Sequence, residues 1–281
     1  MEHNRNLSSL IPETKEAFKR DGFFLMKGFL ATHEVSNYLS IIDDIMDLPK
    51  GSYKLPSTHK QTQTIADGVT KNSKLWPLIF NSKLLVTVRH LVGNDIRYTQ
   101  HSDIHINLPG GRWHRDNAYR EFGCGSDWQE NAETYGVVRV AIYLSDYSNS
   151  GSSLLVLPGS HRQESSINRR EYVFWNKLRS FARRRNVNGA CPHIFLSRPY
   201  VRLKTHPGDC LIFDQRVMHA GGNLHGPLSK YAIYMSYGAN NSHAANHRTF
   251  FLRRPTYSKT IPTALKNRLI DEQLLLPQHD L

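Results

Sequence analysis

Several features are scarce or missing in this chain of 281 residues. Its three cysteines, Cys124, Cys191 and Cys210, are scattered and odd in number, which argues against a disulfide framework and against a structural zinc site. No apolar run approaches the roughly 20 residues of a membrane span, and the first residues lack the apolar core of a signal peptide. Walker-type and dinucleotide-binding glycine motifs are also absent. We therefore expect a soluble, cytoplasmic protein that does not associate with membranes.

Acidic residues are few relative to basic ones. The chain has 36 Lys and Arg against 24 Asp and Glu, a net charge of +12 with a pI near 9.7. Such an excess favours anionic partners, which include nucleic acids, phosphorylated or carboxylated small molecules and acidic glycans. Charge alone does not choose among these partners.

The pattern along the chain predicts one domain over residues 1–281, mainly β with flanking helices. Residues 12–93 are mostly helical in pattern, with a short apolar strand at 23–26, a polar loop at 50–72 and a helix over 75–92 that stops at Gly93. Residues 94–240 are expected to form the β core, whose alternating runs separated by turns are typical of a sandwich or barrel. A basic helical insert is predicted at 162–198, and 241–281 form a C-terminal extension. The predicted strands are 96–108, 136–144, 154–157, 200–206, 210–214 and 231–238.

Two segments about a hundred residues apart offer two histidines and one carboxylate. His114 and Asp116 follow a Pro-Gly-Gly turn, and His219 follows a buried strand and precedes small residues that allow close approach of a ligand. A set of two histidines and one carboxylate covers one face of an iron(II) octahedron and leaves the other face open for substrates. We predict that these three side chains converge on such a metal.

Other histidines offer weaker alternatives. Composition predicts roughly 0.7 His-x-Asp pairs by chance and the chain has two, so the pair alone says little. In the rival set His101, Asp103 and His105, alternation along a strand places all three on one face, but neighbours about 6.6 Å apart in a line fit poorly around one ion. A zinc hydrolase based on His243 and His247 would lack the glutamate that acts as the base.

The chain resembles the phytanoyl-CoA dioxygenase (PhyH-like) family of iron(II)- and 2-oxoglutarate-dependent oxygenases over about residues 16–240. This resemblance implies a double-stranded β-helix core, a jelly-roll of the cupin type, with helices packed outside it. It also implies iron(II), 2-oxoglutarate and dioxygen as cofactor and co-substrates, with His114, Asp116 and His219 as the iron ligands. The segments that carry it are 18–29, 106–109, 114–116, 154–161 and 208–222.

The resemblance further implies a basic residue, usually arginine, eleven positions after the last histidine, to bind the distal carboxylate of 2-oxoglutarate. Here that position holds Lys230, a departure, because a lysine offers a point charge where an arginine offers a planar fork. Arg139 is the substitute candidate for this role. Asn107 matches an asparagine that contacts the co-substrate in some relatives, and its alternative role is that of a turn residue at a strand end.

The implied reaction is hydroxylation of a small, anionic or polar metabolite with release of succinate and carbon dioxide. Desaturation, ring closure and epoxidation stay open, whereas halogenation is disfavoured because halogenating relatives lack the carboxylate that Asp116 supplies here. Arg120 and Arg115 are candidates for substrate binding, each with a structural or solvated charge as its alternative.

The alternative function is a protein that binds or modifies nucleic acid through its basic insert. Arginines over 169–185 stand beside the aromatic residues Tyr172, Phe174 and Trp175, which can stack on bases. A steep salt dependence of DNA or RNA affinity would support this function. The sequence leaves the substrate and the oligomeric state open.

Overall fold

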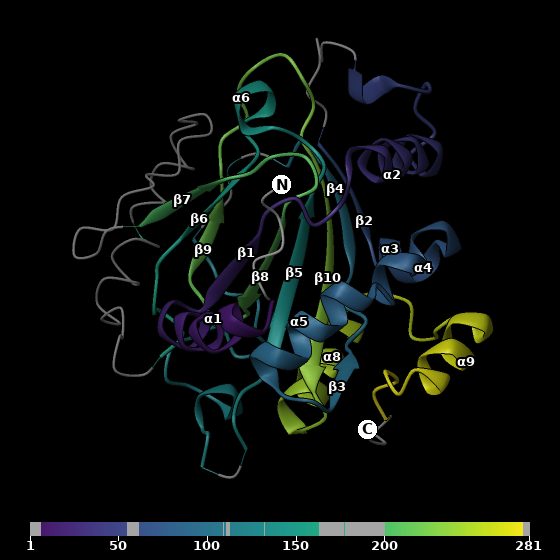
Figure 1. The fold of residues 1–281 in the computed structure, drawn as a ribbon. Coiled ribbons are helices and arrows are strands. Elements are labelled where there is room, and N and C mark those ends of the chain that lie inside the picture. The colour runs from purple at the N-terminus through teal and green to yellow at the C-terminus, as the bar shows by residue number, and fades with distance from the viewer. Residues whose placement is uncertain are drawn as a thin grey trace.

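Two antiparallel sheets lie at the centre of the computed structural model, which describes residues 7–54, 62–108, 110, 113–131, 133–162, 177 and 200–277 (Figure 1). The larger sheet has the order β1-β8-β5-β10-β4-β2, with β3 paired to β10, and the smaller sheet has the order β7-β6-β9. The strands of the larger sheet are β1 (Phe23–Met26), β2 (Gln63–Ala66), β3 (Ile96–Tyr98), β4 (Asp103–Ile106), β5 (Val137–Tyr143), β8 (Cys210–Asp214) and β10 (Tyr231–Ala239). Those of the smaller sheet are β6 (Ser153–Val156), β7 (Val201–Lys204) and β9 (His219–Gly221).

Helices flank the sheets, and α1 and α5 lie against the larger sheet (Figure 1). In α5 the residues Leu84, Leu85, Val88 and Leu91 are buried, the three- and four-residue spacing of one apolar face. Within the described segments, no helix has the length and apolar content that a membrane crossing needs. The helices are α1 (Leu7–Asp21), α2 (Thr32–Ile45), α3 (Gly68–Lys71), α4 (Trp76–Ile79), α5 (Ser82–Val92), α6 (Tyr147–Ser150), α8 (Ser242–Leu252) and α9 (Thr263–Asp271).

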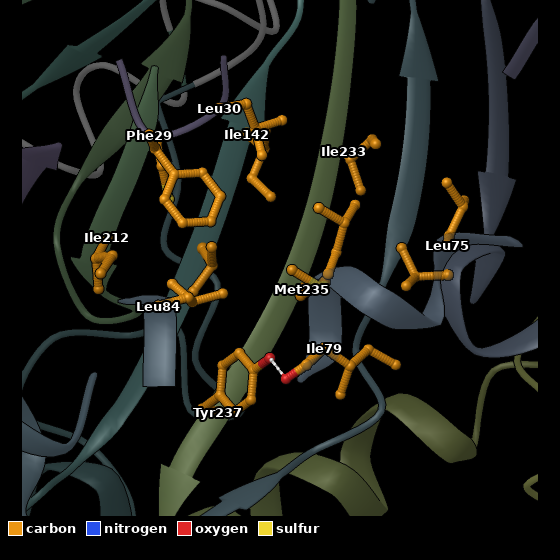
Figure 2. Close-up of a cluster of buried hydrophobic side chains, with 14 of the residues drawn as sticks. Phe29, Leu30, Leu75, Ile79, Leu84, Ile142, Ile212, Ile233, Met235 and Tyr237 are labelled. Carbon is orange, nitrogen blue, oxygen red and sulfur yellow. Dashed lines mark hydrogen bonds between the residues drawn. The ribbon is translucent and has the colours of Figure 1, made fainter. Parts of the chain in front are cut away.

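Alternation along the central strands separates a helix-facing core from an interior that faces the smaller sheet. Ile142 of β5, Ile212 of β8 and Ile233 of β10 belong to the core cluster that packs under the helices (Figure 2). This core also contains hydrogen bonds of tyrosine hydroxyls, such as that of Tyr237, which donates to the Ile79 carbonyl at 2.7 Å (Figure 2). The intervening residues of the same strands point the other way, since successive side chains of a strand alternate between faces. Among them, Phe213, Ala232 and Tyr234 line the cavity described below.

The structure confirms most predicted strands and changes several boundaries. The predicted strand 96–108 is split into β3 and β4, because Gln100 between them adopts a left-handed conformation with φ 60°. The predicted helix 75–92 is broken where Asn81 caps α5 by accepting a hydrogen bond from the Leu84 amide. The polar region 50–72 was predicted as loop but contains β2 and α3, and β9 was not predicted. The basic insert predicted at 162–198 lies, apart from residues 162 and 177, outside the described residues.

Candidate metal centre

Backbone pairing holds the two predicted ligand segments side by side. His114 and His219 form an isolated antiparallel bridge, with the two amide-to-carbonyl hydrogen bonds at 2.9 and 3.0 Å. Two residues along, the Asp116 amide donates to the Gln215 carbonyl at 2.8 Å, just beyond the end of β8. Because β9, which begins at His219, pairs with β6, the bridge also fixes the segment to the smaller sheet. Residues separated by about a hundred positions are thereby brought to one place.

The three side chains converge. The Nε2 atoms of His114 and His219 each lie 3.6 Å from a different oxygen of the Asp116 carboxylate. Their ligand atoms all lie within 4.8 Å of one another, and no other set of three His, Cys, Asp or Glu residues converges in this way in the part of the chain that the structure describes. A single ion with bonds of about 2 Å holds neighbouring donors roughly 3 Å apart, so a small contraction suffices to close this set around a cation.

The protonation of the set suits a divalent cation. The buried His219 donates its Nδ1 proton to the Val217 carbonyl at 2.9 Å, which leaves the Nε2 lone pair facing Asp116. Burial, followed by the nearby His114, lowers the pKa of His219 to about 4, so this imidazole is neutral. Burial raises the pKa of Asp116, but its electrostatic surroundings, which include His219, His114 and the charged Arg139, more than offset this effect and keep it below its ordinary value. Two imidazole nitrogens beside a carboxylate are the donor set that iron(II) takes in non-haem oxygenases.

The three side chains line a cavity of about 370 Å³ that also contains the Lys230 ammonium. Lys230 precedes β10 and is 5% exposed, and burial lowers its pKa to about 8. It forms no ion pair with a carboxylate of the described residues. An anion that enters the cavity stabilises a buried cation of this kind.

Arg139 of β5 also lines the cavity, but its guanidinium is already paired with a carboxylate. Its guanidinium donates to the Asp103 carboxylate, to the His101 carbonyl at 2.7 Å and to the Ser236 hydroxyl at 3.2 Å. Burial raises the pKa of Asp103, but the Arg139 guanidinium keeps this pKa well below its ordinary range. Of the two cations predicted for the co-substrate, Lys230 is therefore the one without a carboxylate partner among the described residues.

Replacing Arg139 with methionine is expected to destabilise the fold by about 3–5 kcal/mol, the typical cost of leaving one member of a buried ion pair without its partner. The change leaves the Asp103 carboxylate, which is 6% exposed, without its cationic partner. Chemical denaturation followed by circular dichroism measures the loss. The double variant Arg139→Met/Asp103→Asn should recover part of it, and equal stability of the single variant and the wild type would contradict this role of the pair.

Two other predicted residues do not face the cavity. Asn107 has a left-handed φ of 53°, and its side chain donates to the Ser229 hydroxyl and accepts from the Lys230 amide, so it holds the Lys230 backbone rather than a ligand. Arg115 is 1% exposed, donates to the Arg216 carbonyl at 2.8 Å and packs against aromatic rings. Neither is among the residues that line the cavity, which argues against the predicted co-substrate and substrate contacts. Arg120 does line it.

The rival histidine sets form structural networks instead. His101, Asp103 and His105 all line the cavity, as the alternation of a strand predicts, yet they are not a converging ligand set. Asp103 is occupied by an arginine and a tyrosine hydroxyl, and the ring nitrogens of His101 and His247 lie 3.2 Å apart. His243 lies beside a buried aspartate and a backbone carbonyl. Neither set offers an alternative metal centre among the described residues.

The C-terminal extension supplies cavity residues that no motif indicated. Phe251 of α8 and Arg254, Thr256 and Tyr257 of the following turn all line the cavity. The run of aromatic and basic residues at 250–254 was the only sequence signal for them.

Comparison with known proteins finds a matching family and related sequences. A family model described as phytanoyl-CoA dioxygenase (PhyH) matches residues 18–231. The ectoine dioxygenase of Nocardia farcinica (strain IFM 10152) is 24% identical over 277 residues, which cover 87% of this chain and 83% of that protein. The dioxygenase FrzG of Cladobotryum sp is 24% identical over 229 residues, 75% of this chain and 68% of that protein.

Solved structures share the fold at lower identity. The epimerase SnoN in complex with Fe3+, alpha ketoglutarate and nogalamycin RO superposes with a TM-score of 0.60 at 13% identity, covering 91% of this chain and 94% of that one. EctD from S. alaskensis with 2-oxoglutarate and 5-hydroxyectoine gives a TM-score of 0.53 at 17% identity, covering 82% and 76%. The predicted double-stranded β-helix with flanking helices is thus confirmed. With the family model spanning most of its length, the chain belongs to the phytanoyl-CoA dioxygenase family and is a non-haem dioxygenase that uses iron(II), 2-oxoglutarate and dioxygen.

Proposed function

We propose that His114, Asp116 and His219 hold the iron(II), that Lys230 binds the distal carboxylate of 2-oxoglutarate, and that the enzyme hydroxylates a small anionic or polar metabolite. Succinate and carbon dioxide are the co-products. The observation that carries this proposal is the convergence of the three ligand atoms within 4.8 Å on the wall of a cavity that also contains a buried ammonium. The proposed compartment is the cytoplasm, whose reducing conditions suit the free thiols of Cys124 and Cys210.

Iron(II) and 2-oxoglutarate, when bound, supply the oxidising chemistry through decarboxylation of the co-substrate and reduction of dioxygen. The chain supplies position and charge. The Val217 carbonyl orients His219, and the centroid of the Phe213 ring lies 4.8 Å from that of the His219 imidazole. Both contacts restrict rotation of this ligand. Leu154 and Ala232 are apolar parts of the cavity lining and reduce the water around the reacting groups.

Lys230 suits the co-substrate better than Arg139 for an energetic reason. A buried ammonium without a counter-ion loses hydration, and this loss is what lowers its pKa. A carboxylate that enters the cavity restores a charged partner and a charge-assisted hydrogen bond. Arg139 offers little such gain, because Asp103 already pairs with it.

The affinity for 2-oxoglutarate is expected to fall as the pH rises above about 8, where Lys230 loses its charge in the free protein. The co-substrate binds the charged form, so binding raises the Lys230 pKa and takes up a proton above that pH. Affinity should therefore be nearly constant below pH 8 and decrease by up to about tenfold per pH unit above it. Among its neighbours in the cavity, burial lowers the pKa of His105 to about 4 and raises that of Tyr234 to about 12, and Arg139 stays charged.

Calorimetric titration of 2-oxoglutarate between pH 6.5 and 9.5 with manganese(II) as an unreactive metal measures this dependence. The matched control is Lys230→Arg, whose guanidinium keeps its charge over the whole range. A flat profile in the wild type, or the same decline in the arginine variant, would assign the pH dependence to another group.

The substrate class is tested by a metabolite screen scored by substrate-dependent succinate release. We expect stimulation by anionic or polar metabolites, and stimulation restricted to neutral apolar compounds would contradict the proposal. Single-stranded DNA and RNA belong in the same screen, because they test the alternative substrate class that the basic composition suggests.

A further inference from the structure

Two arginines of the cavity wall carry charge that no carboxylate of the described residues neutralises. Arg120 follows the ligand pair, Arg254 lies in the turn after α8, and both line the cavity together with His114 and Asp116. Neither takes part in an ion pair within the described ranges, unlike Arg139, which is paired with its aspartate. The Nε atom of Arg120 is buried and has no hydrogen-bond partner there. A buried donor without an acceptor is unfavourable, and a ligand that supplies the acceptor removes this cost.

The two guanidinium groups share one aromatic surface. The Cζ atom of Arg120 lies 5.8 Å from the centroid of the Phe250 ring, and that of Arg254 lies 5.3 Å from the same ring and 4.3 Å from the Phe251 ring. Burial, and after it the charge of Arg120, lowers the pKa of Arg254, as expected for two cations beside the same aromatic ring. An anion placed between them relieves this repulsion.

Both arginines are held in place by their surroundings. The Arg254 amide donates to the Phe251 carbonyl at 3.0 Å, and the Tyr257 amide donates to the Arg254 carbonyl at 3.1 Å. The Tyr257 hydroxyl then ties this turn to β4 by donating to Asp103 at 2.6 Å. Next to Arg120, the Tyr119 carbonyl accepts from the Trp128 indole at 3.0 Å. These contacts fix the backbone positions of both arginines at the cavity.

The charges of the cavity indicate the charge of the substrate that it suits. Asp103 and Arg139 neutralise each other. If the proposed function holds, the two charges of iron(II), together with Asp116 and Lys230, offset the two negative charges of 2-oxoglutarate. The guanidinium groups of the two unpaired arginines remain, so two positive charges are left for the substrate to match.

We infer that Arg120 and Arg254 form an anion-binding subsite for a substrate that carries a dianionic oxyanion, as a phosphate monoester does. The inference rests on the proposed function, because it places this subsite beside the proposed iron ligands and co-substrate. Guanidinium groups bind phosphate oxygens through paired N–H donors, which gives both charge and orientation. The subsite would thereby fix one end of the substrate and direct another part of it toward the metal ligands.

Calorimetry tests the subsite with inorganic phosphate, sulfate and acetate at constant ionic strength, on protein loaded with manganese(II) and 2-oxoglutarate. We expect phosphate and sulfate to bind, and acetate to bind at least tenfold more weakly because it has one charge. Phosphate affinity should fall at least tenfold in Arg120→Ala and in Arg254→Ala. The matched control is Arg253→Ala, which removes the exposed neighbouring arginine and should leave phosphate affinity unchanged.

Phosphate binding that is unchanged in both cavity variants, or lost equally in Arg253→Ala, would overturn the inference. Retention of 2-oxoglutarate affinity within about twofold shows that the variants keep their fold, and Arg254→Gln replaces Arg254→Ala if the latter unfolds. Failure of the wild type to bind 2-oxoglutarate with metal would instead contradict the proposed function. In turnover, the enzyme should release more succinate with phosphate monoesters than with their dephosphorylated forms. The opposite order would also overturn the inference.

Discussion

Replacing Asp116 with alanine is expected to lower the affinity for iron(II) by more than a hundredfold, beyond the 10–100-fold that is typical for loss of a residue that only supports a ligand. The reason is geometric and electrostatic. Asp116 lies 3.6 Å from the Nε2 atoms of both His114 and His219, so it is the central member of the set and its only anion. Without it, two imidazoles remain and the set has no anion, so substrate-dependent succinate release should disappear.

Competition with a chelating dye measures this iron affinity. The matched control is Glu121→Ala, which removes an exposed carboxylate from the same segment and should leave iron affinity unchanged. Iron binding within a few-fold of the wild type in Asp116→Ala would show that the metal is held elsewhere. Equal losses in both variants would point to a general effect of charge on the segment.

Replacing Lys230 with alanine is expected to weaken binding of 2-oxoglutarate by at least about 30-fold, since removing one partner of a buried charge pair costs about 2–5 kcal/mol. Lys230 lines the cavity, is 5% exposed and has no ion-pair partner among the described side chains. Arg139→Ala should affect co-substrate affinity less, because the guanidinium of Arg139 donates to Asp103. The main effect of this substitution should be a loss of stability.

Titration of 2-oxoglutarate into each variant with manganese(II) present gives the two affinities. Lys230→Met is the matched control for side-chain volume, because it keeps the length of the chain without the charge and should resemble the alanine variant. A larger loss in Arg139→Ala than in Lys230→Ala, at equal folded fraction, would transfer the anchoring role to Arg139.

Local patterns in the sequence were sufficient to predict most of the core. The strand over 210–214 has the predicted bounds, because an apolar run between a Pro-Gly-Asp turn and polar residues has one consistent arrangement. Elements such as β9, which begins at His219, were missed because three residues carry no periodic signal and their pairing with β6 is tertiary. The break at Gln100 likewise depends on a left-handed backbone conformation that a glutamine side chain does not predict.

Within the site, the sequence could bring residues together but could not orient all of them. Arg115 stands between the two ligands His114 and Asp116, and alternation of side chains in an extended segment turns it away from them. Its buried contact with the Arg216 carbonyl agrees with that direction. Arg254 could not be predicted, because its place at the cavity depends on the hydrogen bond from Tyr257 to Asp103, which joins residues 154 positions apart.

The most direct test of the central claim is the visible spectrum of the protein with iron(II) and 2-oxoglutarate under anaerobic conditions. We predict the weak charge-transfer band that is typical of a chelate between these two partners, present in the wild type and in Glu121→Ala and absent in Asp116→Ala. A wild-type protein that is folded, contains iron(II) and 2-oxoglutarate in excess, and shows no band would contradict the assignment of His114, Asp116 and His219 as the metal centre.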